Sequence, residues 1–150
     1  MISVVRTNNQ NQDFIDLVKD LDIELAKRDG EDAPFFQQYN INAGLNQAVV
    51  AYKDNLAMGS GAFKKYSNDT CEIKRMFVPE YARGKGIAGI VLKELEQWAL
   101  ELGYKFAILE TGIKMPEAIR LYEKSGYERI PNYDQYAGVD LSVCYKKDLS

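Results

Sequence analysis

The six residues Arg83-Gly84-Lys85-Gly86-Ile87-Ala88 join a stretch of strand character, Thr70 to Val78, to a helical stretch, Gly86 to Leu102. Three glycines lie between positions 84 and 89, and they let the backbone approach a ligand closely. The first amides of a helix have no partner within it, and the helix dipole adds partial positive charge there. This order predicts a phosphate or pyrophosphate site to which Arg83 and Lys85 add charge. A loop that serves only a tight turn is the alternative.

Patterning along the rest of the chain predicts one α+β domain, residues 1–150, with a mixed sheet. Helical spacing predicts a first helix with Phe14, Leu17, Val18, Leu21 and Leu25 on one face. Glu31 to Gly44 is expected to form a short helix or a mobile lip. The helix Gly86 to Leu102 is expected to turn Ile87, Ile90, Val91, Leu95, Trp98 and Leu102 toward a sheet. The expected strands are Ile2 to Thr7, Gln47 to Tyr52, Leu56 to Lys65, Thr70 to Val78, Phe106 to Glu110 and a tail ending at Asp148, and the last helix is Pro116 to Ser125.

Composition narrows the classes of function. With 150 residues, 46% of them hydrophobic, the chain has the size of one domain with one core. A formal net charge of -3 argues against nucleic acid and anionic membranes as partners, and no apolar run approaches the ~20 residues of a membrane span. The expected location is the cytoplasm, with Cys71 and Cys144 buried and reduced. No metal site is expected, and because the chain has no histidine, catalysis must use other groups.

The spacing Gly84-x-Gly86-x-x-Gly89 also satisfies the dinucleotide-binding fingerprint, with Glu110 near the expected position of a ribose-binding acid. That interpretation predicts an NAD-binding domain. The five residues Pro79 to Arg83, however, separate the strand from the first glycine, whereas the dinucleotide fold uses a very short turn. The chain after Glu110 is also too short to complete such a sheet.

Three blocks taken together carry a more specific signal. They are Glu72-Ile73-Lys74-Arg75-Met76-Phe77-Val78-Pro79, the glycine loop, and Ala118-Ile119-Arg120-Leu121-Tyr122-Glu123-Lys124-Ser125-Gly126-Tyr127. In this order they closely resemble the GCN5-related N-acetyltransferase (GNAT) superfamily, most strongly over Thr70 to Ile130. Glu110-Thr111-Gly112 before Pro116 resembles a bacterial branch whose members are mostly of unassigned substrate.

The resemblance implies about seven strands and about four helices, with the fourth and fifth strands splayed to admit the pantetheine arm of acetyl-coenzyme A. It implies that amides of Met76 and Val78 meet the acetyl group and the arm, and that the pyrophosphate lies on the amides from Arg83 to Ala88. The implied cofactor-binding residues are Met76, Phe77, Val78, Arg83, Gly84, Lys85, Gly86, Ile87, Ala88 and Tyr122. Many relatives carry asparagine at the position of Met115, so a side-chain contact from there is not carried over.

Acetyl transfer to an amine needs a base for the amine, an oxyanion stabiliser and an acid for the departing thiolate. Tyr122 matches the family tyrosine that faces the cofactor sulfur, and its alternative role is a packed aromatic. Glu72 matches a glutamate that serves as base in some relatives; otherwise it is an exposed partner of a lysine, on one face with Lys74 and Met76. Glu110 is the second candidate base, or else a residue that stabilises its loop.

The expected activity is direct transfer of the acetyl group to a primary amine of a small molecule or peptide in a ternary complex. A non-catalytic acyl-coenzyme A-binding module remains the alternative. Phe36, Tyr39, Tyr133 and Tyr136 fall in segments expected to border the acceptor cleft. The sequence leaves the acceptor open among an amino acid, a polyamine, an antibiotic and a protein N-terminus, and it leaves a homodimer open as well.

Overall fold

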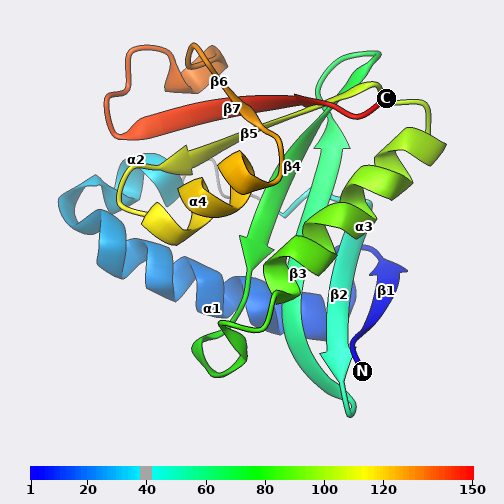
Figure 1. The fold of residues 1–150 in the computed structure, drawn as a ribbon. Helices are drawn as coiled ribbons and strands as arrows, with labels where there is room; N and C mark the ends of the chain where they lie inside the picture. Colours follow the sequence, from blue (N-terminus) through cyan, green and yellow to red (C-terminus); the bar gives the residue numbers. More distant parts are fainter. Residues whose placement is uncertain (38–41) are drawn as a thin grey trace.

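The computed structural model describes residues 1–37 and 42–150, built around a seven-stranded sheet of spatial order β1-β2-β3-β4-β5-β7-β6 (Figure 1). Only β4 and β5 pair in parallel; the other neighbours are antiparallel. This mixed α+β sheet confirms the expected fold class and excludes the dinucleotide-binding alternative, whose sheet is mostly parallel. The strands are β1 (Ser3–Thr7), β2 (Gln47–Lys53), β3 (Leu56–Lys65), β4 (Thr70–Phe77), β5 (Phe106–Gly112), β6 (Glu128–Ile130) and β7 (Ser142–Asp148).

Helices cover both faces of the sheet. The α-helices are α1 (Gln12–Asp29), the short α2 (Ala33–Gln37), α3 (Ile87–Glu101) and α4 (Pro116–Lys124). In Figure 1, α3 and α4 lie in front of the sheet and α1 lies behind it. Two apolar clusters follow from this layering, because successive strand residues point to opposite faces. In β2, Val49 and Ala51 join the cluster under α3, while Ala48 and Val50 join the one under α1.

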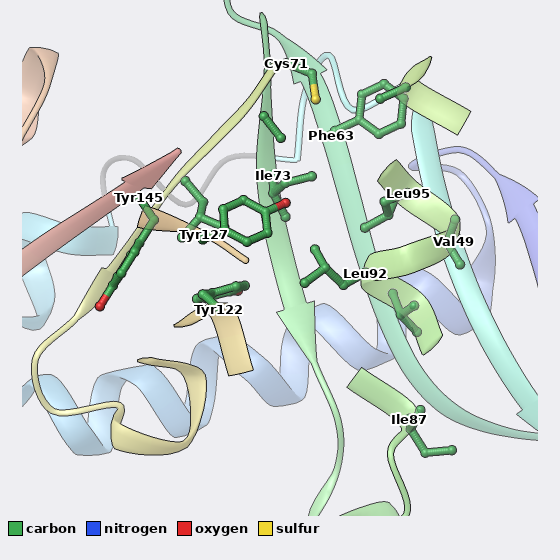
Figure 2. Close-up of a cluster of buried hydrophobic side chains, with 14 of the residues drawn as sticks. Val49, Phe63, Cys71, Ile73, Ile87, Leu92, Leu95, Tyr122, Tyr127 and Tyr145 are labelled. Carbon is green, nitrogen blue, oxygen red and sulfur yellow. The ribbon is translucent and has the colours of Figure 1, made fainter. Parts of the chain in front are cut away.

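Figure 2 shows the larger cluster, in which α3 contributes Ile87, Leu92 and Leu95. Tyr122 from α4 and Tyr145 from β7 enter the same cluster, so it also covers the C-terminal strands. Most residues that were expected to face the sheet from α3 are buried or half-buried, but the prediction was wrong at the edges of this face. Ile90 is 39% exposed and Leu102 is 53% exposed, while Leu92 and Ala99 are buried instead. The buried stripe is displaced because α3 lies across strands of a twisted sheet rather than along one line.

Capping residues and turn residues begin and end the elements near the expected positions. The Asn11 side chain accepts a hydrogen bond from the Phe14 amide at 3.0 Å and caps α1. Asp54 and Asn55 have φ of 52° and 67°, which gives the tight turn between β2 and β3. Pro116 opens α4, and Gly126 with φ of 94° follows it.

The parallel ladder between β4 and β5 is short. It pairs Thr70 with Phe106, Cys71 with Ala107 and Glu72 with Ile108, and no later pair forms. Beyond these pairs the two strands separate, and Figure 1 shows α4 over the opening. The splayed fourth and fifth strands implied by the resemblance are therefore present.

A β-bulge in β4 overturns one expectation. The pairing of β3 with β4 shifts register between Ser60 and Ala62, and opposite this shift Arg75 has φ of 60°. Such a bulge inserts one residue and reverses the alternation beyond it. Met76 consequently packs with the α3 cluster, and Phe77 packs with α1. The prediction that Met76 shares a face with Glu72 and Lys74 was wrong, because alternation alone does not reveal a bulge.

Packing at the bulge leads to a first prediction. A Cβ placed at Gly61 would lie 2.6 Å from Met76 Sδ, 2.7 Å from Leu95 Cδ1 and 2.9 Å from Val91 Cγ1. Gly61→Ala should therefore lower the free energy of unfolding by about 1–3 kcal/mol through overpacking, measured by urea denaturation. Gly89→Ala is the control, because no atom lies within 4 Å of its Cβ; it should keep or raise stability. An unchanged midpoint for Gly61→Ala would contradict the close packing of β3 on α3.

Candidate active site

A cavity of about 280 Å³ lies at the start of α3, beside β4 and α4. We call it the loop cavity. It brings together most of the residues expected to bind a cofactor, although they come from three separate elements. Its lining residues are Leu21, Glu24, Met76, Phe77, Val78, Ala82, Arg83, Gly84, Gly86, Ile87, Ala88, Gly89, Met115, Glu117, Ala118, Leu121 and Tyr122.

The loop at this cavity leaves helix amides without partners. Gly84 and Gly86 have φ of 78° and 77°, a conformation that favours glycine. Gly86 precedes α3 and offers no capping side chain, and the first backbone bond of the helix runs from the Ile90 amide to the Gly86 carbonyl at 3.2 Å. Within the described residues, the amides of Ile87, Ala88 and Gly89 thus remain available to a ligand. Aligned with the helix dipole, they suit an anion such as a diphosphate.

The two basic residues of the loop behave differently from each other. Arg83 lines the cavity, but its guanidinium donates to Glu24 Oε1 at 2.6 Å and to the Val78 carbonyl at 2.9 Å. It therefore ties the loop to α1 while lying at the cavity wall. Lys85 is exposed and does not belong to the lining. Its expected contact with the cofactor stays a prediction.

A second cavity, of about 120 Å³, lies where β4 and β5 separate, and we call it the strand cavity. It shares Leu21, Met76, Met115, Ala118 and Tyr122 with the loop cavity, so the two spaces adjoin. Its polar lining comes from Asp29, Glu72, Lys74, Arg75, Glu110 and Thr111. The remaining lining residues are Leu21, Leu25, Phe36, Ile73, Met76, Gly112, Met115, Ala118, Tyr122 and Tyr136.

Tyr122 lies at the junction of the two cavities. Its side chain is 6% exposed, and its ring packs edge-on against Tyr127 with centroids 5.8 Å apart (Figure 2). Among the described residues its hydroxyl has no hydrogen-bond partner, whereas the neighbouring Tyr127 and Tyr145 hydroxyls bond Glu96 and Glu123. Burial, and then the charge of Glu110, raises the pKa of Tyr122 above its ordinary value, so the phenol carries its proton at neutral pH.

Glu72 is buried, at 5% exposed, and not the exposed strand residue that the alternative interpretation predicted. The Tyr133 hydroxyl donates to its Oε2 at 2.7 Å, and Lys64 Nζ lies 4.0 Å from its Oε1. Burial, with the charge of Glu72, raises the pKa of Tyr133. Tyr133 therefore reaches the site through Glu72 and is not itself part of the cavity lining.

Glu110 lines the strand cavity from the β5 side. The Ser142 hydroxyl donates to its Oε2 at 2.8 Å. Burial raises the pKa of Glu110 to about 7, although this hydrogen bond and the charge of Lys74 act in the opposite direction. A carboxyl group with such a pKa exchanges its proton near neutral pH, as a general base or acid requires.

The expected acceptor residues are brought together only in part. Phe36 of α2 and Tyr136 line the strand cavity, while Tyr39 lies outside the described residues. Met115 lines both cavities and precedes α4 without capping it through a side-chain hydrogen bond. Its Sδ lies 3.3 Å from Nη1 of Arg28, which also pairs with Glu117. Met115 thus acts through packing, where an asparagine would offer a cap.

Sequence reasoning missed Lys74 and the α1 residues of the site, chiefly Leu21, Glu24 and Asp29. Alternation from Glu72 contained the signal for Lys74, since both point to the same side of β4. Nothing local in α1 marks its residues as part of a site.

Cys71 and Cys144 are free and buried, as expected, and burial raises their pKa values to about 12 and about 11. Across residues 1–37 and 42–150, no three His, Cys, Asp or Glu side chains are grouped to hold a metal ion. In the same residues, no helix combines the length and the apolar character of a membrane span.

The sequence profile of the Acetyltransferase (GNAT) family matches residues 12–127, which include both cavities' main elements. The chain belongs to the GNAT acetyltransferase family. As a member, it is an acetyl-CoA-dependent N-acetyltransferase, which confirms the family and the enzyme class expected from the three sequence blocks.

Curated GNAT relatives are of modest similarity. The chain is 39% identical over 85 residues to the uncharacterized N-acetyltransferase YjgM of Escherichia coli, covering 55% of this chain and 50% of that protein. The chain thus matches about half the length of that relative. It is 32% identical over 102 residues to an IAA acetyltransferase of Azospirillum brasilense, covering 67% of each. An uncharacterized N-acetyltransferase of Schizosaccharomyces pombe is 27% identical over 139 residues, covering 88% of this chain and 85% of that protein.

Solved structures confirm the GNAT fold. A Klebsiella pneumoniae protein provisionally described as an acyl-CoA N-acyltransferase superposes with a TM-score of 0.83 at 24% identity, covering 100% of this chain and 99% of that one. A GNAT family acetyltransferase from Elizabethkingia anophelis, solved with acetyl-CoA bound, gives a TM-score of 0.70 at 19% identity and covers 98% and 97% of the two chains.

The environment of Glu110 leads to a prediction about stability. Its pKa is about 7 in the folded GNAT domain against an ordinary value of 4.5, so folding favours the protonated form. Well below pH 4.5 both states are protonated. Between pH 4.5 and 7 the unfolded state loses its proton while the folded state keeps it, so over this range the wild type loses stability that Glu110→Gln keeps. The advantage of Glu110→Gln should grow by on the order of 3 kcal/mol between pH 4 and pH 8 in urea titrations. An advantage that does not change with pH would contradict this environment.

Proposed function

We propose that this GNAT enzyme transfers the acetyl group of acetyl-CoA directly to a primary amine of a small molecule or peptide while both are bound. One observation carries the proposal: two adjoining cavities meet at Tyr122 and Met76. The loop cavity suits a diphosphate with an extended arm, and the strand cavity has the carboxylates that an ammonium group needs. Direct transfer requires the two ligands to meet at one point, and the junction supplies it.

The residues of the loop cavity fit acetyl-CoA, which supplies an activated thioester when bound. The unpaired amides at Ile87, Ala88 and Gly89 would hold its diphosphate, since they are the anion-binding groups of a helix N-terminus. Met76, Phe77 and Val78 run along the side of β4 that β5 has left, and their backbone would hold the arm. The Met76 amide would be the oxyanion donor, because a backbone donor in a strand is already oriented.

Glu110 is the better of the two candidate bases. Its pKa of about 7 lets it accept a proton from an arriving ammonium group near neutral pH, directly or through water. Glu72 already accepts the Tyr133 hydrogen bond at Oε2, and Lys64 Nζ lies 4.0 Å from its Oε1, so its negative charge is partly compensated. In this assignment Glu72 orients Tyr133 and contributes negative charge that attracts the amine.

Tyr122 is the proposed acid. Its side chain is 6% exposed, its hydroxyl has no hydrogen-bond partner in the described part of the chain, and the residue lines both cavities. Its raised pKa makes the phenol a weaker acid than in water. Burial also raises the pKa of a thiol in the same place. The pKa values of the phenol and the thiol therefore remain similar, and a proton from Tyr122 Oη can pass to the sulfur.

The cofactor half of the proposal is tested at Ala88. In Ala88→Asp, a carboxylate stands in the first turn of α3, where it is compatible with the helix dipole but repels a diphosphate. Calorimetry should show acetyl-CoA binding at least about 10-fold weaker, with an unchanged or higher melting temperature. Ala88→Asn, of equal size and no charge, is the control and should bind within about 3-fold of the wild type. Equal binding by the Asp and Asn variants would place the diphosphate elsewhere.

The catalytic half is tested at Tyr122. Tyr122→Phe should lower kcat for thiol release over a panel of amines by about 10²-fold or more, because it removes the acid, and should leave acetyl-CoA affinity unchanged. Tyr145→Phe, in the same cluster but lining neither cavity, should keep its kcat within about 3-fold. Wild-type protein that binds acetyl-CoA tightly but releases thiol only at the background rate would instead be a non-catalytic acyl-CoA-binding module. An isolable acetyl-enzyme would contradict direct transfer.

A further inference from the structure

The strand cavity contains two opposite charges that do not neutralise each other. Lys74 from β4 and Glu110 from β5 both line it, on the two strands that separate there. Lys74 makes no ion pair or hydrogen bond with any described residue, although the charges of Glu72 and Glu110 act on it. A lysine that only balanced these acids would form an ion pair with one of them, as Lys147 does with Glu96 at 2.8 Å.

Burial disfavours the charged form of both Lys74 and Glu110. Burial lowers the pKa of the Lys74 ammonium, and the attraction of Glu72 and Glu110 does not offset it. Burial likewise raises the pKa of Glu110 in spite of Lys74. Each charged form is therefore only partly compensated by its neighbours, while about 120 Å³ of space lies between the surrounding walls.

Neighbouring groups reinforce this separation of charge. Arg75 follows Lys74 at the bulge and lines the same cavity, with its side chain 2% exposed and paired to Asp22 at 2.7 Å. Its Nε is buried without a hydrogen-bond partner among the described residues, so one N–H donor of this positively charged group is not satisfied. Apolar side chains of Leu21, Leu25 and Phe36 form other parts of the wall.

We propose that the acceptor is a free amino acid with an apolar side chain, whose ammonium group lies toward Glu110 and whose carboxylate pairs with Lys74. This inference rests on the proposed function and specifies its substrate class. A zwitterion supplies the ion-pair partner that Lys74 and Glu110 both lack among the described residues, and its side chain packs on the apolar wall. A polyamine or an antibiotic with several amines would instead bring a second ammonium against Lys74, at an electrostatic cost in a site of low dielectric.

Matched acceptors test the proposal. Thiol release with acetyl-CoA is measured for leucine against leucinamide and 3-methylbutylamine, and for phenylalanine against phenylalaninamide and phenethylamine. The wild type should show kcat/KM about 10- to 100-fold higher for the carboxylate-bearing member of at least one series, as a buried charge-assisted pair would give. A preference for the amide or the amine, or turnover confined to polyamines or peptides, would overturn the amino-acid assignment and leave N-acetyl transfer standing.

Substitutions at Lys74 link the preference to this residue. Lys74→Met, which keeps the chain length without the charge, should lose about 10- to 100-fold in kcat/KM for the amino acid and little for the matched amine. Lys74→Arg should recover part of the loss. Lys65→Met on the exposed end of β3 is the control and should leave both acceptors unchanged.

Two further readouts keep the outcomes separate. Acetyl-CoA affinity measured by calorimetry should be unchanged in Lys74→Met, which shows that the variant is folded with an intact loop cavity. N-acetylleucine should raise the wild-type melting temperature more than N-acetyl-3-methylbutylamine does, and Lys74→Met should remove the difference. Equal losses for amino acid and amine in Lys74→Met would overturn the assignment. Absence of turnover with every amine, alongside tight acetyl-CoA binding, would overturn the proposed function itself.

Discussion

The early end of the β4–β5 ladder is the constraint on which the rest of this enzyme depends. Three parallel pairs hold the strands together, and beyond Glu72 and Ile108 the backbone of each strand loses its neighbour on that side. Buried backbone groups without partners are costly, so an opening of this kind persists only where water or a ligand satisfies them. The opening creates the strand cavity and exposes the side of β4 along which the loop cavity extends. Both proposed ligand sites therefore originate in one interruption of a sheet.

The bulge at Arg75 determines which side chains meet this opening. Without it, regular alternation would turn Met76 toward the same side as Lys74. With it, Met76 packs under α3 at the junction of the cavities, and the Arg75 side chain is brought against α1, where it bonds Asp22 and the Val18 carbonyl. A positive φ at a non-glycine residue stores strain, and the ion pair and close packing of Gly61 hold it in place. Strain of this kind is often found where a fold positions a functional group.

Burial tunes the three ionisable groups on which the proposals depend. It keeps Tyr122 protonated, brings the pKa of Glu110 to about 7, and leaves the Lys74 ammonium short of compensation. The same low dielectric acts with opposite sign on acids and bases, which is why one small cavity can prepare a proton donor, a proton acceptor and an anion-binding group. The Ser142 hydroxyl donates a hydrogen bond to Glu110 at 2.8 Å, and the Tyr133 hydroxyl donates one to Glu72 at 2.7 Å; both bonds stabilise the ionised carboxylates.

The sequence by itself determined the order of elements, the glycine loop and the family, because these follow from local patterns: apolar periodicity, glycines at 84, 86 and 89, and three blocks in a specific order. It also indicated Tyr122, Glu72 and Glu110 as chemical groups. Only the tertiary structure decided that Met76 turns away from Lys74, that Glu72 is buried and engaged, and that Lys74 and α1 belong to the site. The physical reason is that register, burial and the balance of charges arise from residues far apart in the chain, which a local pattern does not contain.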